Sequence, residues 1–174
     1  MWAGKAAGAL LVFGSSCAIG WYMAERIRMR TEELRELERA LLLLKGDIRY
    51  AKTALPEAID KLARYHEGSF TEFFRSVSEA MLEYSGISLT EIWRGQAEEL
   101  LKTTALNGRD REFVAGLGDI LGVPDAMLQQ NTLDLAVMRI REEINAASGK
   151  EKEKMYLCRA LGVLGGLFLT ILLL

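Results

Sequence analysis

The chain is apolar at both ends and densely charged between them, and this distribution constrains its fold more than any other feature. Residues 6–24 carry no formal charge, and Arg159 is the one charged side chain in residues 155–174. All acidic residues lie within 25–154. A helix needs about 20 mostly apolar residues to cross the hydrocarbon layer of a bilayer. The sequence therefore predicts transmembrane helices at 1–25 and 155–174, on either side of one domain at 26–154.

The first part of this domain is predicted to be a long helix that continues directly from the first apolar segment. Apolar side chains recur there at steps of three and four residues, the pattern of a helix packed against other helices: Leu34, Leu37, Leu41, Leu44, Ile48, Ala51 and Leu55. The opposite face carries charges that we expect to be solvated: Glu32, Arg35, Glu36 and Arg39. Pro56 disfavours helical geometry in the preceding residue, so the helix is expected to end at Leu55.

Turn and capping signals divide the rest of the domain into five further helices. We predict them at 56–65, 70–84, 89–105 and 109–121, with a last one starting after Asp125 and continuing into the second apolar segment. Ser88 and Glu91 form a capping-box pattern, and Asp125 is the predicted N-cap of the last helix. The predicted core comprises Ile59, Leu62, Ala63, Phe70, Phe73, Phe74, Val77, Met81, Tyr84, Leu89, Ile92, Trp93, Leu100, Leu101, Phe113, Leu117, Ile120, Leu121, Leu128, Leu135, Val137, Met138 and Ile144.

No segment combines strand-like alternation of apolar and polar side chains with enrichment in β-branched residues. The predicted fold class is therefore all-α, a compact six-helix bundle between N- and C-terminal transmembrane helices. We expect the first and last helices to lie side by side, because both enter the same patch of bilayer.

Basic residues next to both apolar segments predict how the chain is oriented. Arg26, Arg28 and Arg30 follow the first segment, and Lys150, Lys152 and Lys154 precede the second. Basic residues near span ends stay in the cytoplasm, so the domain is expected to face the cytoplasm. A signal peptide would carry its positive charges before the apolar run, where only Lys5 and the amino terminus stand. A lipoprotein signal at Cys17 is disfavoured, because Gly14 occupies the position where such signals have leucine.

Within the second segment, Gly162 and Gly166 lie on one helical face, four residues apart. Such pairs of small residues let membrane helices approach closely. The alternative is that both glycines simply face lipid.

Residues that carry chemistry are scarce. With Lys5 set aside, 24 acidic residues stand against 21 basic ones, a near balance that gives no support for nucleic-acid binding. The single histidine, His66, is expected to be a solvated turn residue, and Cys17 and Cys158 lack the neighbours of a metal site. We therefore expect no catalytic residue, no cofactor, no metal and no small-molecule substrate. An enzyme acting at the membrane surface and a small regulatory or receptor-like membrane protein remain the alternatives.

Exposed charges on the second helix of the domain and the turn after it are the candidate partner contacts. They are Glu57, Asp60, Lys61, Arg64 and Glu67. Their expected distance from the membrane would let them meet a cytoplasmic partner. An ordinary solvated surface is the alternative for each of them.

Several segments resemble the stage III sporulation protein AB family over essentially the whole chain. They are residues 41–59 (LLLLKGDIRYAKTALPEAI), Phe73-Phe74, Ile92-Trp93, and residues 117–122 (LGDILG) leading to Asp125 and Gln129-Gln130. Two positions depart from the family pattern: Ala54, where proline is frequent, and Gly46, where a charged helix former is expected.

The resemblance implies a function in a membrane complex between the mother cell and the forespore of endospore-forming bacteria. It also implies a soluble domain similar to the six-helix domain of type II secretion and type IV pilus platform proteins, on which a cytoplasmic ATPase docks. The expected partners are this secretion-type ATPase, neighbouring membrane channel subunits and the lipid bilayer. The expected location is the mother-cell membrane around the forespore.

Overall fold

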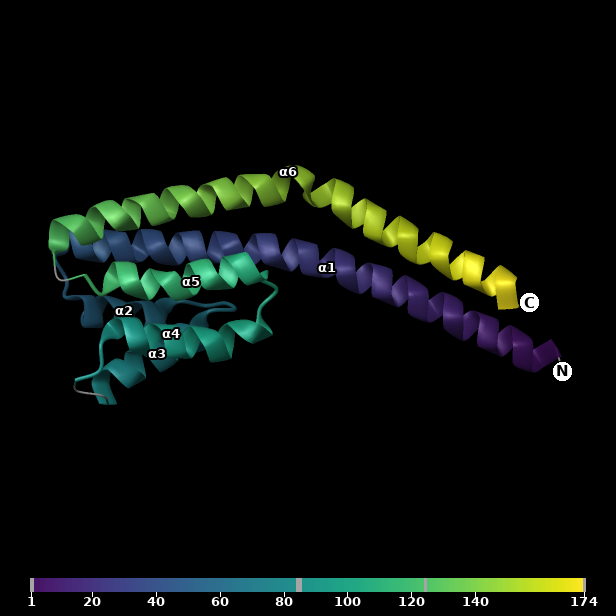
Figure 1. Ribbon diagram of the computed structural model, residues 1–174, viewed down its shortest axis with the longest axis horizontal. Helices are drawn as coiled ribbons and strands as arrows, with labels where there is room; N and C mark the ends of the chain where they lie inside the picture. The colour runs from purple at the N-terminus through teal and green to yellow at the C-terminus, as the bar shows by residue number, and fades with distance from the viewer. Residues whose placement is uncertain (1, 84–85, 124, 174) are drawn as a thin grey trace. The chain divides into compact units, whose positions relative to one another are not determined.

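The computed structural model describes residues 2–83, 86–123 and 125–173, and all regular structure in these ranges is helical (Figure 1). The elements are α1 (Trp2–Arg49), α2 (Leu55–Tyr65), α3 (Thr71–Glu83), α4 (Leu89–Leu100), the 3-10 helix η1 (Leu101–Thr103), α5 (Gly108–Leu121) and α6 (Ala126–Leu173). This confirms the all-α class, although η1 adds a helix to the predicted six. Tyr84 and the side chains of Lys5, Leu100 and Lys150 lie outside the described part of the chain.

The helices form two compact units. Residues 32–145 make up one, and residues 1–31 together with 146–174 make up the other. α1 and α6 contribute to both units without an intervening loop. The membrane boundaries at residues 25 and 155 stay predictions, because the units are defined by packing and not by a bilayer.

In the unit 32–145, α1 buries the predicted apolar seam but ends earlier than expected. Leu34, Leu37, Leu41, Leu44 and Ile48 are buried. The prediction of a helix up to Leu55 was wrong, because α1 ends at Arg49 and Ala51 is exposed. The chain reverses between the two helices, with Lys52 at φ +52° and an extended Ala54 preceding α2. The residues between Arg49 and Leu55 form this reversal and therefore cannot continue the helix.

The caps explain where the later helices begin. Ser88 and Glu91 form the predicted capping box of α4, and Asp125 Oδ1 accepts the N–H groups of Met127 (2.8 Å) and Leu128 (3.1 Å). A second capping box, Asn107 with Asp110, starts α5 and was not predicted. Both capping boxes supply hydrogen-bond acceptors for backbone N–H groups that have no partner within the first helical turn.

An aromatic cluster joins α3, α4 and α5. Phe73 packs edge-to-face on Trp93 with ring centroids 4.9 Å apart, and both side chains are buried. The indole Nε1 of Trp93 donates to the carbonyl of Val114 at 2.7 Å. A Cβ added at Gly118 would lie 2.7 Å from the Trp93 Cβ, so only glycine permits this approach of α5 to α4. Four predicted core residues are only half-buried: Met81, Leu89, Phe113 and Ile120.

α6 buries only part of the predicted set: Val137 and Ile144 are buried as predicted. Leu128, Leu135 and Met138 are exposed, so their assignment to the core was wrong. The buried side chains of this half of α6 are Gln129, Leu133, Ala136, Val137, Ile140 and Ile144. A surface helix buries one apolar stripe, and the stripe from Leu133 to Ile144 is the longer one at helical spacing.

In the other unit, the two apolar segments pack closely through small residues. Ser16 Oγ donates to the carbonyl of Gly162 at 2.8 Å, and a Cβ on Gly20 would lie 2.7 Å from the Cys158 carbonyl oxygen. Gly162 and Gly166 are buried against α1, which supports the packing role over lipid-facing filler.

Within the part of the chain that the structure describes, one stretch, Glu151–Leu172, is long and apolar enough to cross a membrane. The N-terminal apolar segment includes side chains outside that description, at residues 1–7 and 9. The first span therefore stays a prediction.

Candidate partner-binding surface

The candidate partner contacts lie along the outer face of α2. This helix is strongly amphipathic: its inner side buries Ala58, Ile59, Leu62 and Ala63. Pro56 lies in its first turn, where the missing N–H costs nothing. The outer side is left to charged residues, as the sequence predicted.

The structure brings four of the five predicted contact residues together in two pairs. Lys61 Nζ lies 3.4 Å from Glu57 Oε1, and Arg64 Nε donates to Asp60 Oδ2 at 2.8 Å. The fifth, Glu67, is exposed on the turn that follows α2. Exposed ion pairs four residues apart on a helix contribute little to stability, because water screens them. These side chains can therefore exchange their internal partner for an external one at small cost.

Two grooves border α2. Between α2 and α1, one groove is lined by Leu43, Asp47, Lys61 and Tyr65, with His66 among its walls. Between α2 and α3, the other is lined by Glu57, Asp60, Arg64, Met81 and Leu82. Each groove combines apolar walls with charged edges, a composition suited to a protein partner.

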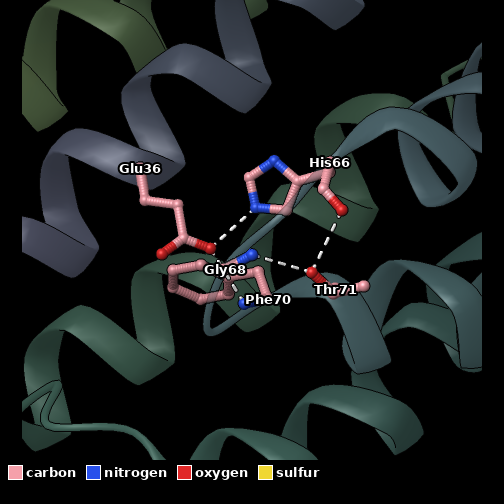
Figure 2. A network of polar contacts seen from close by, with 5 residues as sticks. All are labelled: Glu36, His66, Gly68, Phe70 and Thr71. Atoms are coloured by element: carbon pink, nitrogen blue, oxygen red, sulfur yellow. Dashed lines mark hydrogen bonds and ion pairs between the residues drawn. The ribbon is translucent and has the colours of Figure 1, made fainter.

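The turn after α2 is held on α1 by a buried carboxylate (Figure 2). Glu36 Oε1 lies 2.7 Å from His66 Nε2 and accepts the backbone N–H of Phe70 at 2.9 Å. Thr71 Oγ1 accepts the N–H of Gly68 at 2.9 Å and donates to the carbonyl of His66 at 3.1 Å. Gly68 adopts φ +147°, and a Cβ there would overlap the Glu36 carboxylate.

This junction corrects two predictions. Glu36 and His66 were both expected to be solvated, and both are buried. A helical-wheel argument places Glu36 on the charged face of α1 with Glu32, Arg35 and Arg39, which are indeed exposed. Only the packing of the 66–70 turn onto α1 removes Glu36 from water. No local signal in the sequence indicates that contact.

A second buried carboxylate lies one turn earlier on α1. Glu33 accepts the N–H of Ala105 with both oxygens, at 3.0 and 2.8 Å, and so holds the segment between η1 and α5. Burial raises the pKa of Glu33, and the hydrogen bonds from the backbone do not fully offset it. Burial acts on Glu36 too, but hydrogen bonds from His66, Phe70 and Ser69 outweigh it and its pKa lies below the ordinary value.

The buried side chains of this region hold neighbouring loops in place. The His66 imidazole is buried and bonded to Glu36, and the described residues include no group of three His, Cys, Asp or Glu side chains that could hold a metal ion. Glu36 holds the turn between α2 and α3 on α1, and Glu33 holds the segment between η1 and α5. The contact of Glu36 thereby fixes the C-terminal end of α2 on the bundle.

The sequence profile of stage III sporulation protein AB matches residues 5–174. The chain belongs to this family. Stage III sporulation protein AB of Bacillus subtilis (strain 168) is 25% identical over 169 residues, which cover 97% of this chain and 98% of that protein. The resemblance predicted from the sequence is thus confirmed, and the chain is a sporulation protein.

A solved structure of a stage III sporulation protein AB has a similar fold. The TM-score is 0.65 at 22% sequence identity, over 72% of this chain and 98% of the solved chain. This similarity concerns the fold of the family and assigns no partner to α2.

Proposed function

We propose that the chain is a non-enzymatic membrane platform that docks a cytoplasmic secretion-type ATPase on the outer face of α2. In this proposal two spans hold the helical bundle at the cytoplasmic face of the mother-cell membrane around the forespore. Neighbouring channel subunits of the sporulation complex are the further partners.

The observation that carries the proposal is the continuity of α1 and α6. Each helix extends from the buried core of the unit 32–145 into an apolar segment without a loop. A partner that binds the bundle is thereby connected to the membrane segments through continuous helices. This arrangement suits a protein that transmits the position of a cytoplasmic partner to membrane subunits.

Features of the apolar unit support a membrane location. Arg159, the charge within residues 155–174, lies over the Trp21 ring with its guanidinium 4.5 Å from the centroid. Such a contact offsets part of the cost of a charge near the bilayer interface. Arg26, Lys152 and Lys154 are exposed next to the apolar stretches, where basic residues favour the cytoplasmic side.

The docking surface is tested by exchanging charges on α2. Glu57→Lys with Lys61→Glu reverses the charge pattern presented to a partner while retaining an ion pair within the helix. We expect the full chain with this exchange, solubilised from sporulating cells, to lose co-purification of the ATPase. Glu72→Arg with Arg75→Glu exchanges a similar pair on α3 and is expected to leave co-purification of the ATPase unchanged. Unchanged co-purification with the α2 exchange would remove this face from the proposal.

A further inference from the structure

α6 carries an apolar stripe that the bundle leaves uncovered. Leu128, Leu135 and Met138 are 52%, 63% and 58% exposed. They lie on the side of α6 opposite the buried residues Leu133 and Ile140. Single exposed apolar residues are ordinary on protein surfaces, but a stripe at regular spacing indicates a contact surface.

We propose that this stripe binds a second copy of the chain, with the two α6 helices running in the same direction. Leu128, Asn131, Leu135 and Met138 follow one another at steps of three, four and three residues. This is the spacing of the contact seam of a two-stranded coiled coil. Asn131 is exposed within the seam, where its amide can bond to the same amide of the second copy.

Charges beside the seam favour a second copy over an unrelated helix. In a parallel coiled coil, a residue flanking the seam meets the residue five positions later on the other helix. For Asp134 that residue is Arg139 of the second copy, and the two-fold symmetry of the pair forms this contact twice.

Asp134 and Arg139 already have neighbours within the chain that hold them beside the seam. Asp134 forms ion pairs with Lys45 and Arg49, and the Arg139 guanidinium lies 5.0 Å from the Phe113 ring centroid. Asp134 on one edge of the stripe and Arg139 on the other carry opposite charges, and this pair makes the surface complementary to itself at these two positions.

The common direction of the helices rests on the proposed function. If the second apolar segment is anchored in one bilayer, the α6 helices of all copies enter it from the same side. Confinement to a membrane also raises the effective concentration of one copy around another, so a narrow stripe is sufficient for pairing. Without the membrane the same stripe would pair weakly.

Disulfide crosslinking of the full chain in its native membranes tests this inference. The background carries Cys17→Ala and Cys158→Ala, and Leu128→Cys or Leu135→Cys is the reporter. Equivalent seam positions meet across a parallel pair, so oxidation is expected to give a product of twice the chain mass. Leu82→Cys, on an α3 side chain that is 77% exposed, is the matched control and is expected to stay uncrosslinked.

A second variant separates specific pairing from random collision. Leu135→Lys in the Leu128→Cys chain places like charges opposite each other in the seam and is expected to lower the crosslinked fraction about tenfold. Leu82→Lys in the same chain is expected to leave the crosslinked fraction unchanged. Because both leucines are exposed, neither substitution disturbs the core.

Three results would overturn the inference. The first is no crosslink at Leu128 or Leu135 in a chain that resists carbonate washing, and the second is a crosslinked product whose mass shows a different protein. The third is equal crosslinking at Leu82. Release of the chain by carbonate would instead refute the membrane anchoring of the proposed function, and the common direction of the helices with it.

Discussion

Glu33 and Glu36 lie one turn apart on α1, yet burial and hydrogen bonding shift their pKa values in opposite directions. Three donors, from His66, Phe70 and Ser69, stabilise the Glu36 carboxylate against the cost of burial. For Glu33 the cost of burial outweighs the hydrogen bonds from backbone donors, so the pKa is raised. The nearby charge of Glu36 raises this pKa further. The two residues therefore contribute to stability with opposite pH dependence.

Substitution of Glu36 is expected to matter most at neutral pH. Its folded-state pKa lies below the unfolded value, so its stabilising contribution is complete above about pH 4.3 and is lost as the pH falls through the folded-state pKa. Glu36→Gln is expected to lower the free energy of unfolding at pH 7 by about 1–3 kcal/mol. Denaturant titrations of the full chain at several pH values should show the difference from wild type shrinking in acid.

For Glu33→Gln we expect the opposite pH dependence of the loss in stability. The pKa of Glu33 is raised on folding, so its contribution to stability decreases as the pH rises from the unfolded to the folded pKa. The cost of Glu33→Gln should therefore be smaller at neutral pH than in acid. The same pH trend for both variants would contradict the assignment.

Gly68 is the second sensitive residue of this junction. Gly68→Ala is expected to cost about 1–3 kcal/mol from the positive φ, and about as much again from displacing the Glu36 carboxylate. Gly86 also has a positive φ, +117°, but a Cβ there meets nothing within 4 Å. Gly86→Ala should therefore show the backbone cost alone. Equal melting temperatures of the two variants would argue against the Glu36 contact.

At the scale of the elements, Gly118 permits the close packing of α5 on α4. Trp93 fills the space beside Gly118, and Thr90 Oγ1 donates to the Gly118 carbonyl at 3.2 Å. The contact with Trp93 requires that α5 carries no side chain at position 118. The sequence predicted both helices and the burial of Trp93, but no pattern identified Gly118 as the residue that admits the indole.

Gly118→Ala should destabilise the bundle, because its Cβ would lie 2.7 Å from the Trp93 Cβ. Overpacking of this kind costs about 1–3 kcal/mol. Gly116, two residues earlier on α5, has open space around it, and Gly116→Ala should stabilise by up to about 1 kcal/mol through helix propensity. Thermal unfolding of both variants checks the opposite signs, and a stabilised Gly118→Ala would refute the packing argument.

At the scale of the whole molecule, contact between the two apolar segments depends on backbone approach. Gly20→Val would drive its side chain into the Cys158 carbonyl and the Gly162 backbone. We expect a loss of about 1–3 kcal/mol, measured as a lower melting temperature of the full chain in detergent micelles. Gly14→Val is the matched control, since a Cβ there meets nothing within 4 Å. Equal effects at both positions would show that the segments do not pack through Gly20.

Prediction from the sequence succeeded where the signal is local. The capping box at Ser88, the N-cap at Asp125 and the seam from Leu34 to Ile48 were all predicted and confirmed. Each depends on residues within one or two helical turns. Four of the five candidate contacts were likewise predicted to share one helix, and their two ion pairs lie on α2. The partner of this surface stays a prediction.

The sequence by itself determined the helical class, most of the helix starts and the two apolar ends, because hydrophobic spacing and capping act between neighbouring residues. Only the tertiary structure decided that Glu36 and His66 are buried and that Leu128, Leu135 and Met138 are exposed. Burial depends on which surfaces meet, and these residues take their environment from segments far along the chain. A charged residue on a helix is solvated until another loop packs over it, and an apolar residue is core only when a neighbouring element covers it.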